Sequence, residues 1–175
     1  TQVANGGSIG LSELMQPKIE AEIAFVLKTD LDIQNPSQED IVNAIDYASP
    51  AIEIVGSRIT DWNIRIADTV ADNASASHFV VGDNKVNLSD IDLINCKMRI
   101  EGHQGIVSEG VGSACLGNPI TAVQWLANTM IEFGTPLRQG EIILSGALGP
   151  MHTIESSGSY SSEIEGLGSV SVTFS

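Results

Sequence analysis

Residues 17–25 read Pro-Lys-Ile-Glu-Ala-Glu-Ile-Ala-Phe, an alternation that predicts a β-strand with one apolar face and one acidic face. Side chains two residues apart on a strand point to the same side, so Glu20 and Glu22 share one face. The apolar face predicts packing on a core. The acidic face needs a separate explanation, although a lone Glu-x-Glu pair on a strand is commonly just solvated.

A third glutamate lies in a second apolar run. Residues 50–55 read Pro-Ala-Ile-Glu-Ile-Val, which surrounds Glu53 with apolar neighbours on both faces of a strand. A buried carboxylate must be paired, protonated or bound to a cation, and Arg58 offers a plain ion pair as the alternative to a metal. If the three carboxylates converge, they form an oxygen-rich site suited to Mg²⁺ or Mn²⁺.

Composition narrows the classes of partner. The 175 residues, 42% of them hydrophobic, favour one globular domain. A net charge of −14, from 22 acidic and 8 basic residues, argues against nucleic acid and anionic membranes as partners. Cys96 and Cys115 form no CxxC pair, which favours reduced thiols in the cytoplasm over a soft-metal site. No apolar run reaches the roughly eighteen residues of a membrane span.

The domain organisation is simple. Residues 1–16 are rich in Gly, Ser and Asn before turning mildly apolar, and we interpret them as a lead-in or the remnant of an N-terminal region. Residues 17–175 are expected to form a single metal-binding catalytic domain. The start of the chain lacks Met and the features of a signal peptide, so we expect a fragment or a processed piece.

Capping residues, turn residues and apolar periodicity along the sequence predict few helices and many strands. One helix is expected over 37–48, capped by Ser37 and ended by Ser49-Pro50, and another over 119–133, capped by Asn118. The apolar residues within 57–75 follow neither the helical period nor the strand period of two, so we expect a short helix or loop that crosses a site. The expected strands are 17–28, 50–55, 78–82, 97–101, 106–109 and a hairpin over 159–175. Residues 141–150 are expected to be a buried strand that opens into a glycine-containing loop. This pattern predicts a β-dominated α+β domain with two main helices.

Five ordered motifs carry a family resemblance: Gln-Pro-Lys-Ile-Glu-Ala-Glu-Ile-Ala-Phe-Val-Leu (16–27), Pro-Ala-Ile-Glu-Ile-Val-Gly-Ser-Arg-Ile (50–59), Asp-Thr-Val-Ala-Asp-Asn-Ala-Ser (68–75), Leu-Gly-Asn-Pro (116–119) and Leu-Ser-Gly-Ala-Leu-Gly-Pro-Met (144–151). Together they resemble the 2-keto-4-pentenoate hydratase family of the fumarylacetoacetate hydrolase superfamily. The resemblance implies a mixed β-roll of the C-terminal domain type of that superfamily. It also implies that Glu20, Glu22 and Glu53 bind one Mg²⁺ or Mn²⁺.

The same resemblance implies a hydro-lyase of aromatic meta-cleavage catabolism. Its members add water to 2-hydroxypenta-2,4-dienoate to give 4-hydroxy-2-oxopentanoate, form homo-oligomers and associate with a decarboxylase partner. Substrate binding is expected at positions in the signature motifs: Asp72, Asn73, Ser75, Ser145 and Gly146. The alternatives are a polar loop that satisfies its own backbone around Asn73 and a plain turn after the strand that ends near Ser145.

The chain departs from the family at its start. Family members carry a region before the Glu-x-Glu strand that supplies a lysine and acidic residues for proton transfer, whereas only about sixteen residues precede it here. The catalytic proton-transfer residue is therefore unknown, Lys18 is not assigned as a substitute, and impaired activity is expected. His78, His103 and His152 are interpreted as surface or core residues. The alternative functions are 2-oxo-3-hexenedioate decarboxylase and an inactive structural or assembly unit.

Overall fold

The first of two β-sheets is built around the acidic strand. In the computed structural model, which describes residues 1–175, β3 (Lys18–Leu27) pairs antiparallel with β4 (Ile45–Val55). The remaining strands of this sheet are β5 (Ala76–Val81) beside β4, β1 (Gln2–Val3) beside β5, and β8 (Ile142–Leu144) and β9 (His152–Thr153) on the other edge of β3. The central pair thus carries neighbours on both sides.

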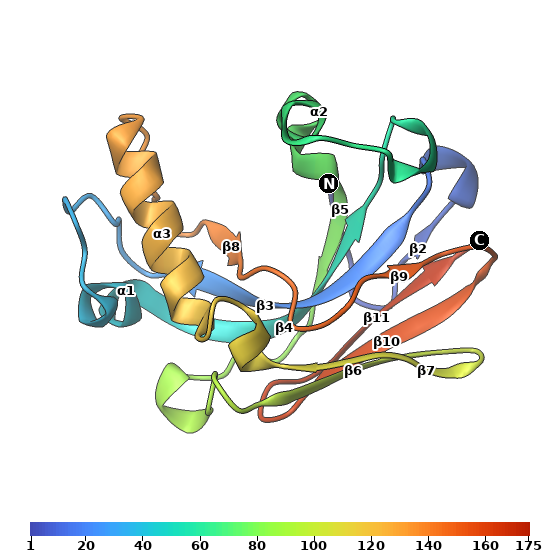
Figure 1. Ribbon diagram of the computed structural model, residues 1–175. Helices are drawn as coiled ribbons and strands as arrows, with labels where there is room; N and C mark the ends of the chain where they lie inside the picture. Colours follow the sequence, from blue (N-terminus) through green and yellow to red (C-terminus); the bar gives the residue numbers. More distant parts are fainter.

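The second sheet packs against the first (Figure 1). Its strand order is β2 (Ser8–Ile9), β11 (Gly168–Phe174), β10 (Gly158–Ile164), β6 (Lys97–Gly102) and β7 (Gly105–Val111). Because side chains alternate along β3, Ile19, Ile23 and Phe25 enter the shared core, and all three are fully buried. The glutamates of β3 therefore point away from the second sheet.

Three α-helices lie outside this sandwich: α1 (Gln38–Ala44), α2 (Ile66–Ala71) and α3 (Pro119–Glu132). Figure 1 shows α1 and α3 together at one end of the first sheet and α2 above β5. The side chain of Asn118 caps α3 by accepting from the Ile120 amide, as predicted. The predicted β-dominated α+β class is confirmed, with parallel pairs at β1–β5 and β2–β11 and antiparallel pairs elsewhere.

Two predicted boundaries are wrong. Ser37 does cap the first helix in a capping box with Asp40, but the helix ends at Ala44 instead of Ala48. Ser49 and Pro50 lie inside β4, since residues from Ile45 onward pair with β3 and bury apolar side chains there. Cross-strand pairing and burial outweigh the local helical pattern. Within residues 141–150, by contrast, the structure agrees with the prediction, because β8 opens into the expected glycine-containing loop.

The structure agrees with the prediction for residues 57–75. Residues 57–75 contain two 3₁₀ turns (60–62 and 73–75) around α2, as expected for a short helix or loop. Residues 1–16 contribute β1 and β2, which pair at the edges of the first and second sheets. None of the α-helices combines the length and apolar character that crossing a bilayer needs.

Candidate metal centre

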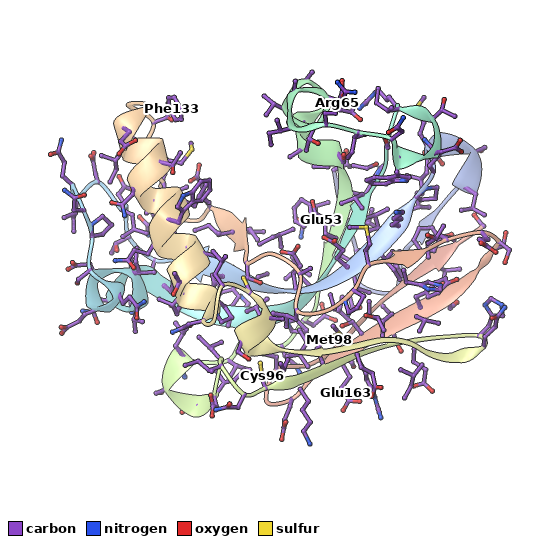
Figure 2. All side chains as sticks on the ribbon, viewed as in Figure 1. Glu53, Arg65, Cys96, Met98, Phe133 and Glu163 are labelled. Carbon is purple, nitrogen blue, oxygen red and sulfur yellow. The ribbon has the colours of Figure 1, made fainter.

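Strand register brings the three glutamates together. Glu20 lies directly opposite Glu53 in the β3–β4 pair, and opposed residues of antiparallel strands point to the same face. Glu22 shares that face because it is two residues from Glu20. One carboxylate oxygen from each glutamate lies within 4.8 Å of the others. Figure 2 shows Glu53 in the open space between α3 and the α2 segment.

Burial leaves these carboxylates without the solvent that normally stabilises their charge. Glu22 is 2% exposed, while Glu20 and Glu53 are half-buried. Desolvation, followed by the negative charge of Glu53, raises the pKa of Glu22 to about 8. Desolvation also raises the pKa of Glu20 and of Glu53. The one hydrogen bond from the backbone to this cluster is donated by the Gly146 amide to Glu22 Oε2, at 2.7 Å.

Basic side chains do not neutralise the cluster. Arg58, the alternative partner of Glu53, forms its ion pair with Asp72 instead. The other ion pairs join Arg99 to Glu163 and Arg138 to Asp30 and Asp32, all on the surface. Three converging oxygen donors with no counter-charge are the donor set that Mg²⁺ and Mn²⁺ prefer. The residues present therefore fit a hard divalent cation, with Glu20, Glu22 and Glu53 as its ligands.

Lys18 is a basic side chain near this strand face. Its charge lowers the pKa of Glu20, opposing the larger effect of desolvation. The Lys18 ammonium lies 4.4 Å from the centroid of the Trp62 ring, a cation–π contact that holds it beside the cluster. The indole nitrogen of Trp62 donates in turn to the backbone carbonyl of Gln16, at 3.0 Å. Lys18 therefore borders the acidic centre without forming an ion pair with it.

We predict that Mn²⁺ affinity rises as the pH increases from 6 to 8. The raised pKa of Glu22 means that the metal-free protein holds a proton in this cluster below about pH 8, and a bound cation must displace it. Calorimetric titrations in buffers of different ionisation enthalpy measure the affinity and count the released protons. An affinity independent of pH, with no proton release, would contradict this linkage.

Of the predicted substrate residues, Asp72 is occupied by protein contacts. Its carboxylate pairs with the Arg58 guanidinium and also accepts from the Arg58 amide, at 3.2 Å. The backbone amide is the main reason that the pKa of Asp72 is lowered, and the guanidinium adds to it. This pair agrees with the expectation that Arg58 braces a carboxylate. It ties the 68–75 motif to the end of β4.

The neighbouring turn is strained. Asn73, Ala74 and Ser75 follow one another with positive φ values of 52°, 54° and 62°. Left-handed backbone is unfavourable for residues with a Cβ, and such strain is typical of functional segments. Asn73 lines a cavity with Glu53, and the hydroxyl of buried Ser75 has no hydrogen-bond partner. Asn73 therefore lies where a bound ligand can use its polar atoms, whereas the buried Ser75 is not among the residues that line this cavity.

The loop after β8 supports the cluster from the other side. The Ser145 hydroxyl accepts from the Ile23 amide at 3.0 Å and donates to the Gly146 carbonyl at 2.8 Å. With the Gly146 amide committed to Glu22, these two residues position the glutamate strand. The amides of Ala147 and Gly149 donate to no acceptor in the protein, so they are the free donors of this loop.

The sequence reasoning missed three apolar residues beside the cluster. Phe79 of β5 lies opposite Glu53, and Leu144 and Ile142 of β8 pair with β3 on the glutamate face. All three line a cavity of about 280 Å³ together with Glu53. The sequence pattern that could have pointed to these residues was the alternation of side chains in the predicted strands within 78–82 and 141–144. It could not say which face of which sheet those residues would occupy.

Comparisons with known proteins show which proteins this chain resembles. Residues 3–175 match the family model described as fumarylacetoacetate (FAA) hydrolase C-terminal. The 2-keto-4-pentenoate hydratase of Burkholderia vietnamiensis is 51% identical over 97% of this chain and 65% of its own length. The TodF product hydratase of Pseudomonas putida is 52% identical over 97% of this chain and 63% of its own length. The chain thus spans less than two thirds of these relatives.

A solved structure matches the whole fold. The 4-oxalocrotonate decarboxylase of Pseudomonas putida G7, in complex with magnesium and adipate, superimposes with a TM-score of 0.93 and 34% identity. The match covers 99% of this chain and 66% of the decarboxylase. A second structure of that enzyme holds calcium and acetate. The predicted β-roll of this superfamily is confirmed, and the similar enzyme binds a divalent cation.

Proposed function

Because this chain belongs to the fumarylacetoacetate hydrolase family, we propose that it carries the metal centre of a 2-keto-4-pentenoate hydratase. The reaction adds water to 2-hydroxypenta-2,4-dienoate and yields 4-hydroxy-2-oxopentanoate. The observation that carries the proposal is the convergence of Glu20, Glu22 and Glu53 within 4.8 Å, without a basic partner. Relatives about half identical to this chain and named as hydratases support the choice of reaction.

The three glutamates would hold Mg²⁺ or Mn²⁺. When bound, the cation supplies a Lewis acid for the carboxylate and the 2-oxygen of the substrate. The protein contributes the surroundings of that centre. Gly146 orients Glu22, and the free amides of Ala147 and Gly149 are donors suited to the substrate carboxylate. The side chain of Asn73 offers a further polar contact at the cavity, and the hydroxyl of Ser75 in the same turn is buried without a hydrogen-bond partner.

The proposed reaction adds protons to two carbon atoms of the substrate, C5 and C3, and water to C4. Loss of the 2-hydroxyl proton and protonation at C5 convert the dienol into its tautomer, a 2-oxo-3-enoate. The C4 atom of this tautomer is electrophilic because its double bond is conjugated with the ketone. Water then adds at C4, and C3 gains a proton. Phe79, Ile142 and Leu144 line the cavity beside Glu53, where this conjugated part would lie.

We predict a metal-dependent loss of dienol absorbance. With saturating Mn²⁺, 2-hydroxypenta-2,4-dienoate should disappear and 4-hydroxy-2-oxopentanoate should form, whereas a chelator stops both. Ultraviolet absorbance follows the substrate, and chromatography identifies the product. Glu101→Gln, an exposed change on β6, is the matched control and keeps the activity. Binding of Mn²⁺ without any turnover would instead favour the inactive structural unit.

The similarity to 4-oxalocrotonate decarboxylase supports one alternative. A 2-oxo-3-hexenedioate decarboxylase also polarises a 2-oxo acid at a divalent cation. Release of CO₂ from the hexenedioate, with no hydration of the pentadienoate, would reverse the assignment.

The proposal also covers the assembly, the cellular location and the domain organisation of the protein. From the resemblance we infer a homo-oligomer in the cytoplasm that associates with a decarboxylase partner. Residues 17–175 would form its catalytic domain and residues 1–16 a lead-in. Sedimentation of the protein alone and with a family decarboxylase measures both kinds of assembly.

A further inference from the structure

Lys18 lies on the same face of the first sheet as the metal centre. It is two residues before Glu20 on β3 and opposite Val55, which is two residues after Glu53 on β4. Side chains two residues apart on a strand point to the same side, while Ile19 enters the core. The half-buried Lys18 side chain therefore borders the Glu20 end of the three-carboxylate cluster.

The indole of Trp62 fixes the position of the Lys18 ammonium, which lies 4.4 Å from the ring centroid. The ring is itself held, because its nitrogen donates to the Gln16 carbonyl at 3.0 Å. The Gln16 side chain closes the same loop: its oxygen accepts from the Asp61 amide at 2.7 Å, and its nitrogen donates to the Ile59 carbonyl at 2.7 Å. This network presents a lysine ammonium at a defined place beside the cluster.

The same network contains three residues with strained backbone. Gln16, Asp61 and Trp62 have positive φ values of 48°, 56° and 54°. Left-handed backbone is unfavourable for residues with a Cβ, and it persists where surrounding contacts maintain it, commonly in functional segments. The convergence of all three on the Lys18 contact favours a function for this ammonium.

The Lys18 ammonium has no acidic partner in the protein. The ion pairs involve Arg58, Arg99 and Arg138 instead. Desolvation raises the pKa of Glu20, and the Lys18 charge opposes that rise, so the two groups interact without forming an ion pair. Three carboxylates and one divalent cation would leave one net negative charge, which repels an anionic ligand. Lys18 supplies the positive charge that balances it.

We propose that Lys18, held by Trp62, binds the anionic head of a 2-oxo acid at the metal centre. This role rests on the proposed function, which requires such an acid at the glutamates. The Gly146 amide donates to Glu22, so the loop after β8 borders the other end of the cluster, and Lys18 complements its free amides from the Glu20 end. Lys18 is thus a ligand-binding residue, separate from proton transfer, and Trp62 is its positioning residue.

Replacing Lys18 with Met separates ligand binding from metal binding. Mn²⁺ should bind about two- to fivefold more tightly, because one cation no longer repels another. The affinity of the Mn²⁺-loaded protein for 2-oxopentanoate, a saturated acid with no double bond to hydrate, should fall about tenfold. Calorimetry measures both. Shifts of opposite sign exclude a loss of folding, since an unfolded site would bind neither.

Lys85→Met is the matched control. The Lys85 ammonium lies 4.7 Å from the centroid of the Tyr47 ring, so the variant removes the same charge and the same kind of contact. Tyr47 is six residues from Glu53 on β4, about 20 Å along the strand, beyond the range of a screened charge. Both affinities should stay unchanged. Lys18→Arg keeps the charge and can stack on the indole, so it should retain most of the affinity for 2-oxopentanoate.

The Trp62 contact gives a spectroscopic measurement. In a Trp125→Phe protein, Trp62 is the one tryptophan of the chain. Saturating 2-oxopentanoate should change its emission by drawing the Lys18 ammonium from the indole face, and Lys18→Met should abolish the change. Trp62→Leu should weaken 2-oxopentanoate binding less than Lys18→Met does, because the ammonium remains but loses its fixed position.

The outcomes distinguish this role from the proposed function. Unchanged 2-oxopentanoate affinity in Lys18→Met, or an equal loss in Lys85→Met, would overturn the role of Lys18 and leave the proposed function standing. Parallel loss of Mn²⁺ and 2-oxopentanoate binding in Lys18→Met would overturn it too, because Lys18 would then support only the structure. An unmodified Mn²⁺-loaded protein that binds no 2-oxopentanoate would contradict the proposed function, and the role of Lys18 with it.

Discussion

Replacing Glu53 with Gln is expected to weaken Mn²⁺ binding by about 100-fold or more. Glutamine keeps the size of the side chain and one oxygen but removes the negative charge facing the cation. At the few-ångström separation set by the cluster, one charge is worth several kcal/mol even with partial screening, and each 1.4 kcal/mol is about tenfold in affinity. Calorimetric titration with Mn²⁺ at pH 8 measures the change.

The matched control for this experiment is Glu101→Gln. Glu101 lies exposed on β6, so its replacement makes the same change in net charge without touching the cluster. Its Mn²⁺ affinity should equal that of the unmodified protein. Similar affinities for the Glu53→Gln protein and this control would remove Glu53 from the ligand set.

Replacing Glu22 with Gln is expected to stabilise the metal-free protein at pH 8 while it weakens metal binding. The pKa of Glu22 is raised from 4.5 to about 8, so its carboxyl is protonated in the folded state and ionised in the unfolded state between these values. The folded state binds the extra proton, and stability therefore falls as the pH rises through this window. Glutamine removes that penalty, and its oxygen can still accept from the Gly146 amide.

The free energy of unfolding of the metal-free Glu22→Gln protein is expected to be higher by on the order of 2 kcal/mol at pH 8, after allowance for relaxation of the protein around the Glu22 charge. For a domain of this size, that corresponds to a rise in Tm of about 4–8 °C. Thermal unfolding with a chelator present measures it. At pH 4.5 most of the gain should be lost, because Glu22 is then protonated in the folded state and about half protonated in the unfolded state. With saturating Mn²⁺ the unmodified protein should be the more stable of the two. A Glu22→Gln protein that is less stable than the unmodified protein without metal at pH 8 would contradict this dependence of stability on the Glu22 proton.

A loss of stability in the metal-free protein is expected when a cation-binding site is built from buried carboxylates. Three carboxylates on one face of adjacent strands repel one another, and desolvation adds to the cost. Folding tolerates them because the opposite face of the same strands carries Ile19, Ile23 and Phe25 into the core. The metal site is thus destabilising without its cation and stabilising with it.

Local sequence patterns were sufficient for several features. Period-two alternation in residues 17–25 located β3 and assigned Glu20 and Glu22 to one face, because the geometry of a strand leaves no other arrangement. Capping residues located the starts of α1 and α3 for an equally local reason, since a cap satisfies backbone amides within a few residues. The ordered motifs were sufficient to identify the family, which the family model confirms.

Other features depended on contacts between distant parts of the chain. The pairing of Glu20 with Glu53 and the presence of residues 45–48 in a strand instead of a helix depend on strand partners far away in the sequence. The pairing of Arg58 with Asp72 likewise joins two separate elements. Local periodicity cannot specify strand register, because register is set by which apolar sets are buried together. The sequence by itself therefore determined the acidic strand face and the family. Only the tertiary structure decided that three carboxylates converge and that Phe79, Ile142 and Leu144 flank them, because β4, β5 and β8 reach β3 only when the whole sheet is assembled.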